Sequence, residues 1–220
     1  VLKKGNGENK KRIMTTAHMD EIGLCVVKIT EQGFLKVKKM GGVSAHCSFM
    51  NRVVFKNGVT GTVAAMDKPE NFKSTDIDKL YVDIGALSKE DAEKYVKVGD
   101  CAMFEGEYRE LAGRNVMAKA FDDRGACHIQ IEALKNMKTP YHDVYFVFTV
   151  QEVGLFGATT SSERVKPDLG IAVDITGSFD VPGDEHGNAV LGKGAAVKVN
   201  DASVICDDDM VEQMVKCAEK

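Results

Sequence analysis

Residues 143–150 read Asp-Val-Tyr-Phe-Val-Phe-Thr-Val, a nearly continuous apolar run of the length of one β-strand. A run of this kind, without regular polar alternation, is typical of a strand that is covered on both faces. Helical patterns lie on both sides of it in the sequence, at residues 123–136 and 155–163. The segment therefore predicts a sheet that is packed between helices.

Further strands extend this pattern in both directions along the chain. Residues 12–17 form a short buried strand, residues 169–174 are largely apolar, and residues 211–218 belong to a closing helix. Strands that alternate with helices indicate an α/β fold whose sheet is covered by helices on both faces. We expect one such domain to comprise residues 1–26 and 115–220.

The middle of the chain, residues 27–114, has a different texture. Short β-rich pieces at 52–55, 60–64, 80–84 and 101–104 are separated by Gly, Asp and Lys turns, with one short helix at 89–95. This spacing is typical of a small β-barrel or sandwich. We therefore predict a β-rich domain, a small barrel, inserted into the α/β domain.

Composition excludes several classes of protein. The 220 residues carry a net charge of −4, with no basic stripe, so nucleic acid is not an expected partner. No apolar run reaches the roughly 18–20 residues that cross a bilayer, and six cysteines without CxxC pairing indicate a reducing compartment, the cytoplasm. Because the chain starts at Val1 and stops on a charged helix, we expect a fragment that lacks both ends.

Chemically competent side chains follow the predicted strands or precede a helix. They are His18 with Asp20, the pair Asp122 and Asp123, Glu152 and Asp174. In an open α/β sheet, functional groups gather beyond the carboxyl ends of the strands. One histidine with several carboxylates and no thiolate suits zinc, cobalt or manganese.

These residue types suggest separate roles. Asp20 fits a carboxylate that fixes the tautomer of His18, and Asp122 fits a ligand that bridges two cations. A nearby glutamate could accept a proton from a water that a cation has acidified. Taken singly, each acid could instead be a helix cap, and His18 a surface histidine. Their occurrence at successive strand ends favours a shared site.

At these positions the sequence resembles the M42 family of tetrahedral, or glutamyl, aminopeptidases. The similar segments are TAHMDEIG at 16–23, AFDDRG at 120–125, FTVQEVGLFGA at 148–158, AVD at 172–174, DVPG at 180–183 and LGKG at 191–194, with GG at 41–42 and VDIGA at 82–86 in the insert. The resemblance spans essentially the whole chain in the same order.

This resemblance implies roles for individual residues. His18 and Asp174 are implied as terminal ligands of one metal, Asp122 as the bridging ligand with Asp123 as the alternative, and Asp20 as the group that orients His18. The family has two adjacent glutamates, a general base and a metal ligand, whereas this sequence has only Glu152, which could be either. The family's last ligand, a histidine in an HSP-like segment, has no counterpart here, and His186 is expected in a surface loop.

The resemblance also implies an activity. Two divalent cations per subunit, zinc or cobalt and alternatively manganese, would activate water to remove N-terminal residues from short peptides. The insert would assemble the protein into homo-oligomers, from dimers to dodecamers. Alternatives are another two-metal amide hydrolase, such as a carboxypeptidase or deacylase, or a catalytically impaired subunit for assembly or regulation. The family's old label, endoglucanase, is disfavoured because glycosidases use paired carboxylates and not a metal-binding histidine.

Overall fold

The computed structural model describes residues 1–71, 73–183, 187, 189–201 and 203–219. It divides into two compact units, Val1–Ile175 and Thr176–Lys220. Within the described ranges, none of the helices combines the length and the apolar character that crossing a bilayer requires.

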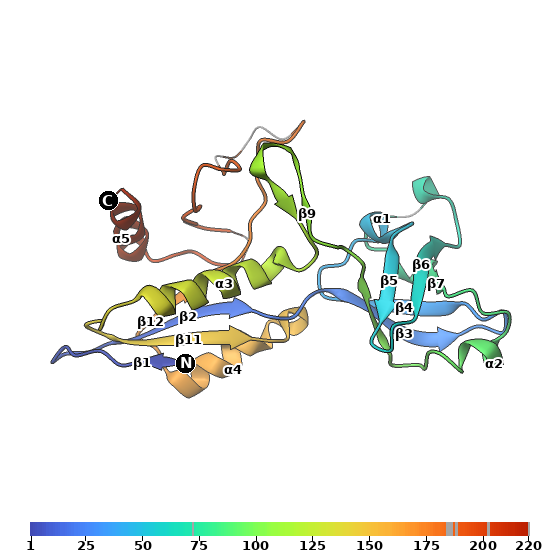
Figure 1. Cartoon of the computed structure of the whole chain (residues 1–220), viewed down its shortest axis with the longest axis horizontal. Helices are drawn as coiled ribbons and strands as arrows, with labels where there is room; N and C mark the ends of the chain where they lie inside the picture. Colours follow the sequence, from blue (N-terminus) through green and yellow to red (C-terminus); the bar gives the residue numbers. More distant parts are fainter. Residues whose placement is uncertain (72, 184–186, 188, 202, 220) are drawn as a thin grey trace. The chain divides into compact units, whose positions relative to one another are not determined.

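The first unit contains the predicted mixed sheet (Figure 1). Its strands lie in the order β1 (Leu2–Lys3), β11 (Asp143–Thr149), β2 (Arg12–His18) and β12 (Leu169–Ala172). β1 runs antiparallel to β11, whereas β11, β2 and β12 are mutually parallel. The register pairs Thr149 with His18, so β11 and β2 end side by side.

Helices α3 (Phe121–Asn136) and α4 (Phe156–Val165) lie on opposite sides of this sheet in Figure 1. Ala126 and Cys127 of α3 form a small buried cluster with Ala17 of β2. Small side chains at this contact let the helix approach the strand closely, next to the end of β2. The predicted α/β sheet between helices is confirmed.

The predicted barrel is also present. Its strands close in the order β3 (Gly23–Ile29), β4 (Leu35–Met40), β7 (Leu80–Asp83), β6 (Thr60–Ala65), β5 (Arg52–Phe55) and β8 (Cys101–Phe104). Alternate residues such as Leu24, Leu35, Val63 and Val82 point inward and are fully buried. These side chains make the barrel interior the larger of the two apolar cores found in the described residues.

Glycine fixes the hairpin between β3 and β4. Gly33 adopts a φ of +88°, and its N–H donates to the carbonyl of Thr30 at 2.9 Å. A Cβ at this position would lie 2.8 Å from the Ala86 carbonyl oxygen. Both the backbone conformation and the close approach therefore require glycine here.

Several elements differ from the sequence predictions. β3 belongs to the barrel from Gly23 onward, so the expected boundary between residues 26 and 27 falls inside one strand. The helix expected at 89–95 is regular only over α2 (Lys89–Ala92). A short ladder of β9 (Arg109–Glu110) with β10 (Val116–Met117) was not predicted.

The remaining elements are short. They are α1 (Ala45–Ser48), the 3-10 turns η1 (Pro69–Asn71), η2 (Ile77–Lys79), η3 (Ala112–Arg114) and η4 (Glu152–Gly154), and in the second unit α5 (Asp208–Ala218). Asp207 caps α5 by accepting a hydrogen bond from the Met210 N–H at 3.0 Å. An aspartate at this position is a favoured N-cap, so α5 begins where a helix start signal stands in the sequence.

Candidate metal centre

The parallel strands deliver their following residues to one edge of the sheet. His18 is the last residue of β2, and Asp174 follows β12 by two residues. Asp122 lies in the irregular first turn of α3, which packs against β2. The carboxyl ends of adjacent parallel strands thus meet where the sequence placed its candidate ligands.

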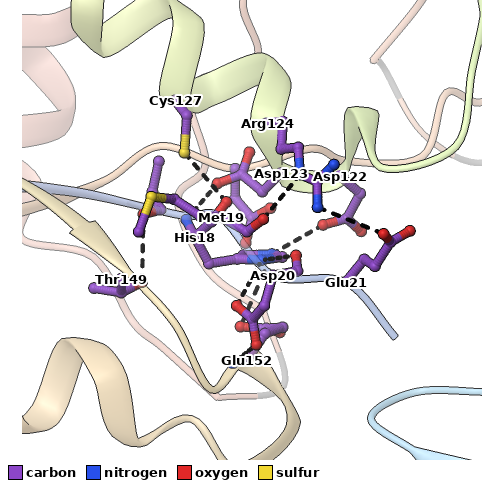
Figure 2. Close-up of polar contacts among 12 residues, drawn as sticks. His18, Met19, Asp20, Glu21, Asp122, Asp123, Arg124, Cys127, Thr149 and Glu152 are labelled. Atoms are coloured by element: carbon purple, nitrogen blue, oxygen red, sulfur yellow. Dashed lines mark hydrogen bonds and ion pairs between the residues drawn. The ribbon is translucent and has the colours of Figure 1, made fainter. Parts of the chain in front are cut away.

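A cluster of potential ligands forms at this edge. One donor atom from each of His18, Asp122 and Asp174 lies within 4.8 Å of the others. The His18 Nε2 atom is 3.0 Å from Asp122 Oδ1, as Figure 2 shows. His18 is buried, whereas Asp122 and Asp174 are exposed. One imidazole and two carboxylates converge on a volume the size of a cation's coordination shell.

Glu152 borders this cluster. It opens the 3-10 turn η4 directly after β11 and the intervening Val150 and Gln151, and its Oε2 atom lies 3.9 Å from His18 Nε2. Gln151 adopts a left-handed conformation, φ +69°, which turns the chain sharply at the strand end. The carboxylates of Glu152 and Asp122 both lie near the Nε2 atom of the His18 ring (Figure 2).

Asp20 supports His18 in a way that differs from the sequence prediction. The atom within hydrogen-bond distance of His18 Nδ1 is the backbone carbonyl oxygen of Asp20, at 3.0 Å, while its carboxylate Oδ1 lies 3.6 Å away. The carboxylate Oδ2 instead accepts the Glu152 N–H at 3.0 Å. With its proton on Nδ1, the ring donates to that carbonyl and leaves the Nε2 lone pair facing Asp122 and Glu152.

Unsatisfied polar atoms mark the same place. Among the described residues, the buried atoms Asp20 Oδ1 and Asp123 Oδ1 have no hydrogen-bond partner. Buried carboxylate oxygens without a partner are costly, and cations offset that cost. Together with the chemistry of the donor set, this pattern fits a site that holds divalent cations.

Asp123 has a different position from Asp122, to which a cis peptide bond joins it. It is fully buried, and its Oδ2 accepts the backbone N–H of His18 at 3.1 Å. Burial, the largest influence, raises the pKa of Asp123 to about 6. The structure thus places Asp122, not Asp123, in the cluster with His18 and Asp174.

The charges at the site influence one another. Burial and the neighbouring carboxylates of Asp174, Asp122 and Asp20 raise the pKa of Glu152, against the opposing effect of His18. For His18, burial alone would lower the pKa, but the Asp20 carbonyl and the charges of Glu152, Asp123 and Asp174 together raise it. Part of each shift comes from the neighbouring carboxylates, whose negative charge a cation would neutralise.

Three charged residues around the site were not singled out from the sequence. The half-buried Glu21 pairs with Lys119, 2.7 Å from its Nζ, and with Arg124, 3.5 Å from its Nη2. Arg124 Nε also donates to the Met19 carbonyl at 2.9 Å. These contacts tie the segment after β2 to the start of α3, and thereby hold His18 and Asp122 in proximity. Only Glu21 and Arg124 lie inside the AHMDEIG-like and DDR-like segments, and those positions could have indicated them, whereas Lys119 lies one residue before the second segment.

Among the described residues, His128 and His142 do not belong to this cluster. His128 lies on the exposed side of α3, and His142 accepts the Lys11 N–H at 3.1 Å through its Nδ1 atom. His186, expected in a surface loop, lies outside the described residues.

Comparisons with known proteins show what the whole chain is similar to. The sequence model described as M42 glutamyl aminopeptidase matches residues 1–220. A protein of Acetivibrio thermocellus with aminopeptidase in its name is 44% identical over 221 residues, which cover 100% of this chain and 66% of that protein. Aminopeptidase APDkam598 from the archaeon Desulfurococcus kamchatkensis has a TM-score of 0.89 at 37% identity, covering 99% of this chain and 64% of its own.

A third comparison concerns assembly. The TET1 peptidase of Pyrococcus horikoshii, described as able to form a tetrahedron or a large octahedral shell, has a TM-score of 0.79 at 33% identity. The match covers 97% of this chain and 67% of that one. This chain therefore spans less than two thirds of the length of the first two proteins and about two thirds of the third.

Proposed function

Because this chain belongs to the M42 glutamyl aminopeptidase family, we propose that the whole protein is a metal-dependent aminopeptidase that removes N-terminal residues from short peptides. The observation that carries the proposal is the convergence of His18, Asp122 and Asp174, with donor atoms within 4.8 Å of one another. Residues 104 and 52 positions apart in the chain meet there without another evident structural need. A shared cation is the simplest reason for this convergence.

We assign the metal ligands as His18, Asp122 and Asp174, with Glu152 as a further candidate. Imidazole and carboxylate ligands suit zinc and cobalt and accept manganese. Two bound cations would supply Lewis acidity, which acidifies water and polarises the peptide carbonyl. Asp122, whose Oδ1 lies 3.0 Å from His18 Nε2, would be the ligand that the two cations share.

The chain's own residues then do the positioning and the proton transfer. The Asp20 carbonyl holds the His18 ring, and the Asp20 carboxylate holds the backbone of Glu152. Glu152 is the carboxylate at the border of the cluster, so it is placed to take a proton from water and to give it to the departing amine. Asp20 thus couples the position of the ligand to that of the base.

Glu152 has two possible roles, and one pair of variants distinguishes them. As a general base, Glu152→Gln would keep both cations and lose about 10²–10⁴-fold in kcat. If Glu152 is instead a metal ligand, the Glu152→Gln protein would bind one cation fewer. Metal content by atomic emission and turnover by a chromogenic assay, measured on the same samples and with Glu152→Asp alongside, decide between the roles.

The central test uses the whole protein with zinc, cobalt or manganese on amino-acid nitroanilides and short peptides. We expect successive release of residues from the N-terminus, loss of turnover in His18→Ala, and no loss in His128→Ala, which removes an exposed histidine of α3. Release only from the C-terminus would contradict the proposal and indicate a carboxypeptidase.

A second function is favoured by one feature, the single glutamate in Gln151-Glu152-Val153. If the whole protein binds two cations per subunit and releases no residue from any peptide, it is an impaired subunit for assembly or regulation. Metal content and turnover from the central test separate these two functions.

We further propose that residues 27–114 mediate homo-oligomer assembly and that the protein is cytoplasmic. The similar TET1 peptidase of P. horikoshii, described as able to form a tetrahedron or a large octahedral shell, supports the first point. The barrel also exposes large apolar side chains, among them Leu87, at 91% exposure. Light scattering of the whole protein tests assembly: a multimer that Leu87→Asp weakens is expected, and a monomer at assay concentration contradicts it.

A further inference from the structure

Two cysteines face each other on the barrel. Cys25 on β3 pairs in register with Cys101 on β8, the first and last strands of the barrel. Neither is part of the candidate metal centre, and both are free thiols. The chemistry of this pair is independent of the proposed function.

The ladder defines the type of pair. The Val26 N–H donates to the Asp100 carbonyl at 2.9 Å, a bond that flanks the Cys25–Cys101 position. Because Val26 and Asp100 are hydrogen-bonded, the next pair in these antiparallel strands, Cys25 and Cys101, is a non-hydrogen-bonded pair. In such pairs the Cα atoms lie about 4.5 Å apart. Disulfides form between residues whose Cα atoms are about 4.4–6.8 Å apart. The backbone therefore already permits a bond.

Both thiols are on the outside of the barrel. Leu24, Val26 and Ala102 alternate with the cysteines and are buried in its core, whereas Cys25 is half-buried and Cys101 is exposed. The Cys25 thiol donates to the Val26 carbonyl and the Cys101 thiol to the Gly99 carbonyl, each at 3.8 Å, so both thiols lie at neighbouring positions of the same outer surface. Burial and then this neighbouring thiol raise the pKa of Cys101. Because Cys101 is exposed and Cys25 is half-buried, a small reagent can reach the pair from solvent.

Charged residues of both signs surround the pair. Lys38 on β4 stands opposite Cys25 in the register on the other side of β3, so the outer face carries Lys38, Cys25 and Cys101 across adjacent strands. The carboxylate of Asp100, next to Cys101 in the chain, adds a negative charge that helps to raise the pKa of the Cys101 thiol. An uncharged small disulfide is therefore the suitable reagent for this pair.

We propose that Cys25 and Cys101 form a dithiol site that low-molecular-weight disulfides oxidise reversibly. One cysteine thiolate attacks the small disulfide, forms a mixed disulfide and releases one small thiol. The second cysteine then attacks the protein sulfur of that mixed disulfide, loses its proton and releases the second small thiol. The two cysteines are oxidised and the small disulfide is reduced to two thiols, so electrons and protons balance.

Oxidation would join β3 and β8, the strands with which the chain enters and leaves the barrel. β3 begins five residues after His18, and β8 precedes the segment that returns to α3. A bond between Cys25 and Cys101 would close a loop that contains most of the barrel, which restricts the unfolded chain more than the folded one. The oxidised barrel is therefore the more stable form.

The test uses the full chain, fully reduced, then incubated with hydroxyethyl disulfide. Peptide mapping by mass spectrometry without reduction is expected to show a Cys25-containing peptide joined to a Cys101-containing peptide. The joined peptides should together be two hydrogen atoms lighter than the two reduced peptides and carry no adduct, and a dithiol reductant should separate them again. Retention of the reagent on both cysteines as separate adducts, or two thiols that stay free, would overturn the proposal.

Two variants refine this test. Cys25→Ser removes the second thiol, so Cys101 should retain the reagent as a stable mixed disulfide with the corresponding gain in mass. Cys47→Ser removes an exposed cysteine of α1 and should leave the crosslink unchanged. If Cys25→Ser shows the same products as the unmodified chain, or if the bond joins two chains, the assigned pair is wrong.

Discussion

Carboxylates, a backbone carbonyl and a thiol all contact His18. Its Nε2 faces Asp122, its Nδ1 meets the Asp20 carbonyl, and its backbone N–H is bonded to buried Asp123. Its own carbonyl accepts the Cys127 thiol at 3.2 Å. A ring fixed by so many contacts enters the cluster in one orientation, which lowers the reorganisation that ligand binding requires.

Asp20 provides the first prediction at this scale. Asp20→Ala removes the carboxylate that accepts the Glu152 N–H, so we expect metal affinity and kcat/KM to fall about 10–100-fold, as for other residues that orient ligands. Asp20→Asn keeps one acceptor oxygen and should lose less. Calorimetric titration with zinc measures the affinity, and Asp78→Ala, an exposed acid in the barrel, serves as control. Equal losses in all three variants would contradict the assigned role.

Part of the site could be predicted from the residues themselves. His18, Asp122 and Asp174 each stand at the end or start of an element that apolar patterning locates, and that placement alone brings them together. The adjacent acids Asp122 and Asp123 have the same chemistry, and only the fold decides which of them is exposed and which is bonded to His18. The sequence likewise does not predict that Asp20 contacts His18 through its backbone carbonyl and not through its carboxylate.

At the scale of elements, the β3–β4 hairpin shows how local conformation and packing combine. Gly33 and Gly58 both have positive φ angles, +88° and +87°, but only Gly33 has a carbonyl where its Cβ would be. Conformation alone should cost Gly58→Ala about 1–2 kcal/mol of unfolding free energy. Gly33→Ala should lose clearly more, as measured by urea denaturation. Similar losses in both variants would show that the carbonyl contact does not matter.

The start of β11 offers a pH-dependent prediction. Asp143 accepts the Gly5 N–H at 2.8 Å, and this bond, with the charge of Lys10, lowers the pKa of that carboxyl. A carboxyl with a lowered pKa in the folded state stabilises the fold above its unfolded pKa of about 3.9, and this effect disappears as pH falls. Asp143→Asn should therefore lower the melting temperature at pH 7 and have little effect near pH 3.

Elements with a strong apolar pattern were predicted closely, and elements without one were missed. Arg52–Phe55 and Cys101–Phe104 are strands over the expected residues. β9 and β10 consist of exposed residues, so neither burial nor alternation signals them. α2 ends at Ala92 because the Lys94 N–H bonds to Asp91 in a tighter turn, which residue preferences alone do not predict.

The whole chain combines a barrel with a well-filled interior and a sheet whose buried cluster beside the site is small. Cations that bind only the folded state should therefore stabilise the sheet measurably, by about 2.7 kcal/mol at a hundredfold excess over Kd. We expect a chelator to lower the melting temperature in calorimetry, and no such shift in His18→Ala. An unchanged melting temperature of the parent protein would contradict cation binding by the native state.

The parallel ladder that ends with Thr149 opposite His18 has a consequence for behaviour on warming. Loops lose their shape gradually with temperature, whereas a hydrogen-bonded ladder persists until it melts cooperatively. Because His18 is itself one of the paired residues of these strands, the orientation of its side chain should be nearly independent of temperature up to the unfolding transition. Heat would then disrupt the candidate metal centre abruptly, at the melting of β2, with no earlier change in its geometry.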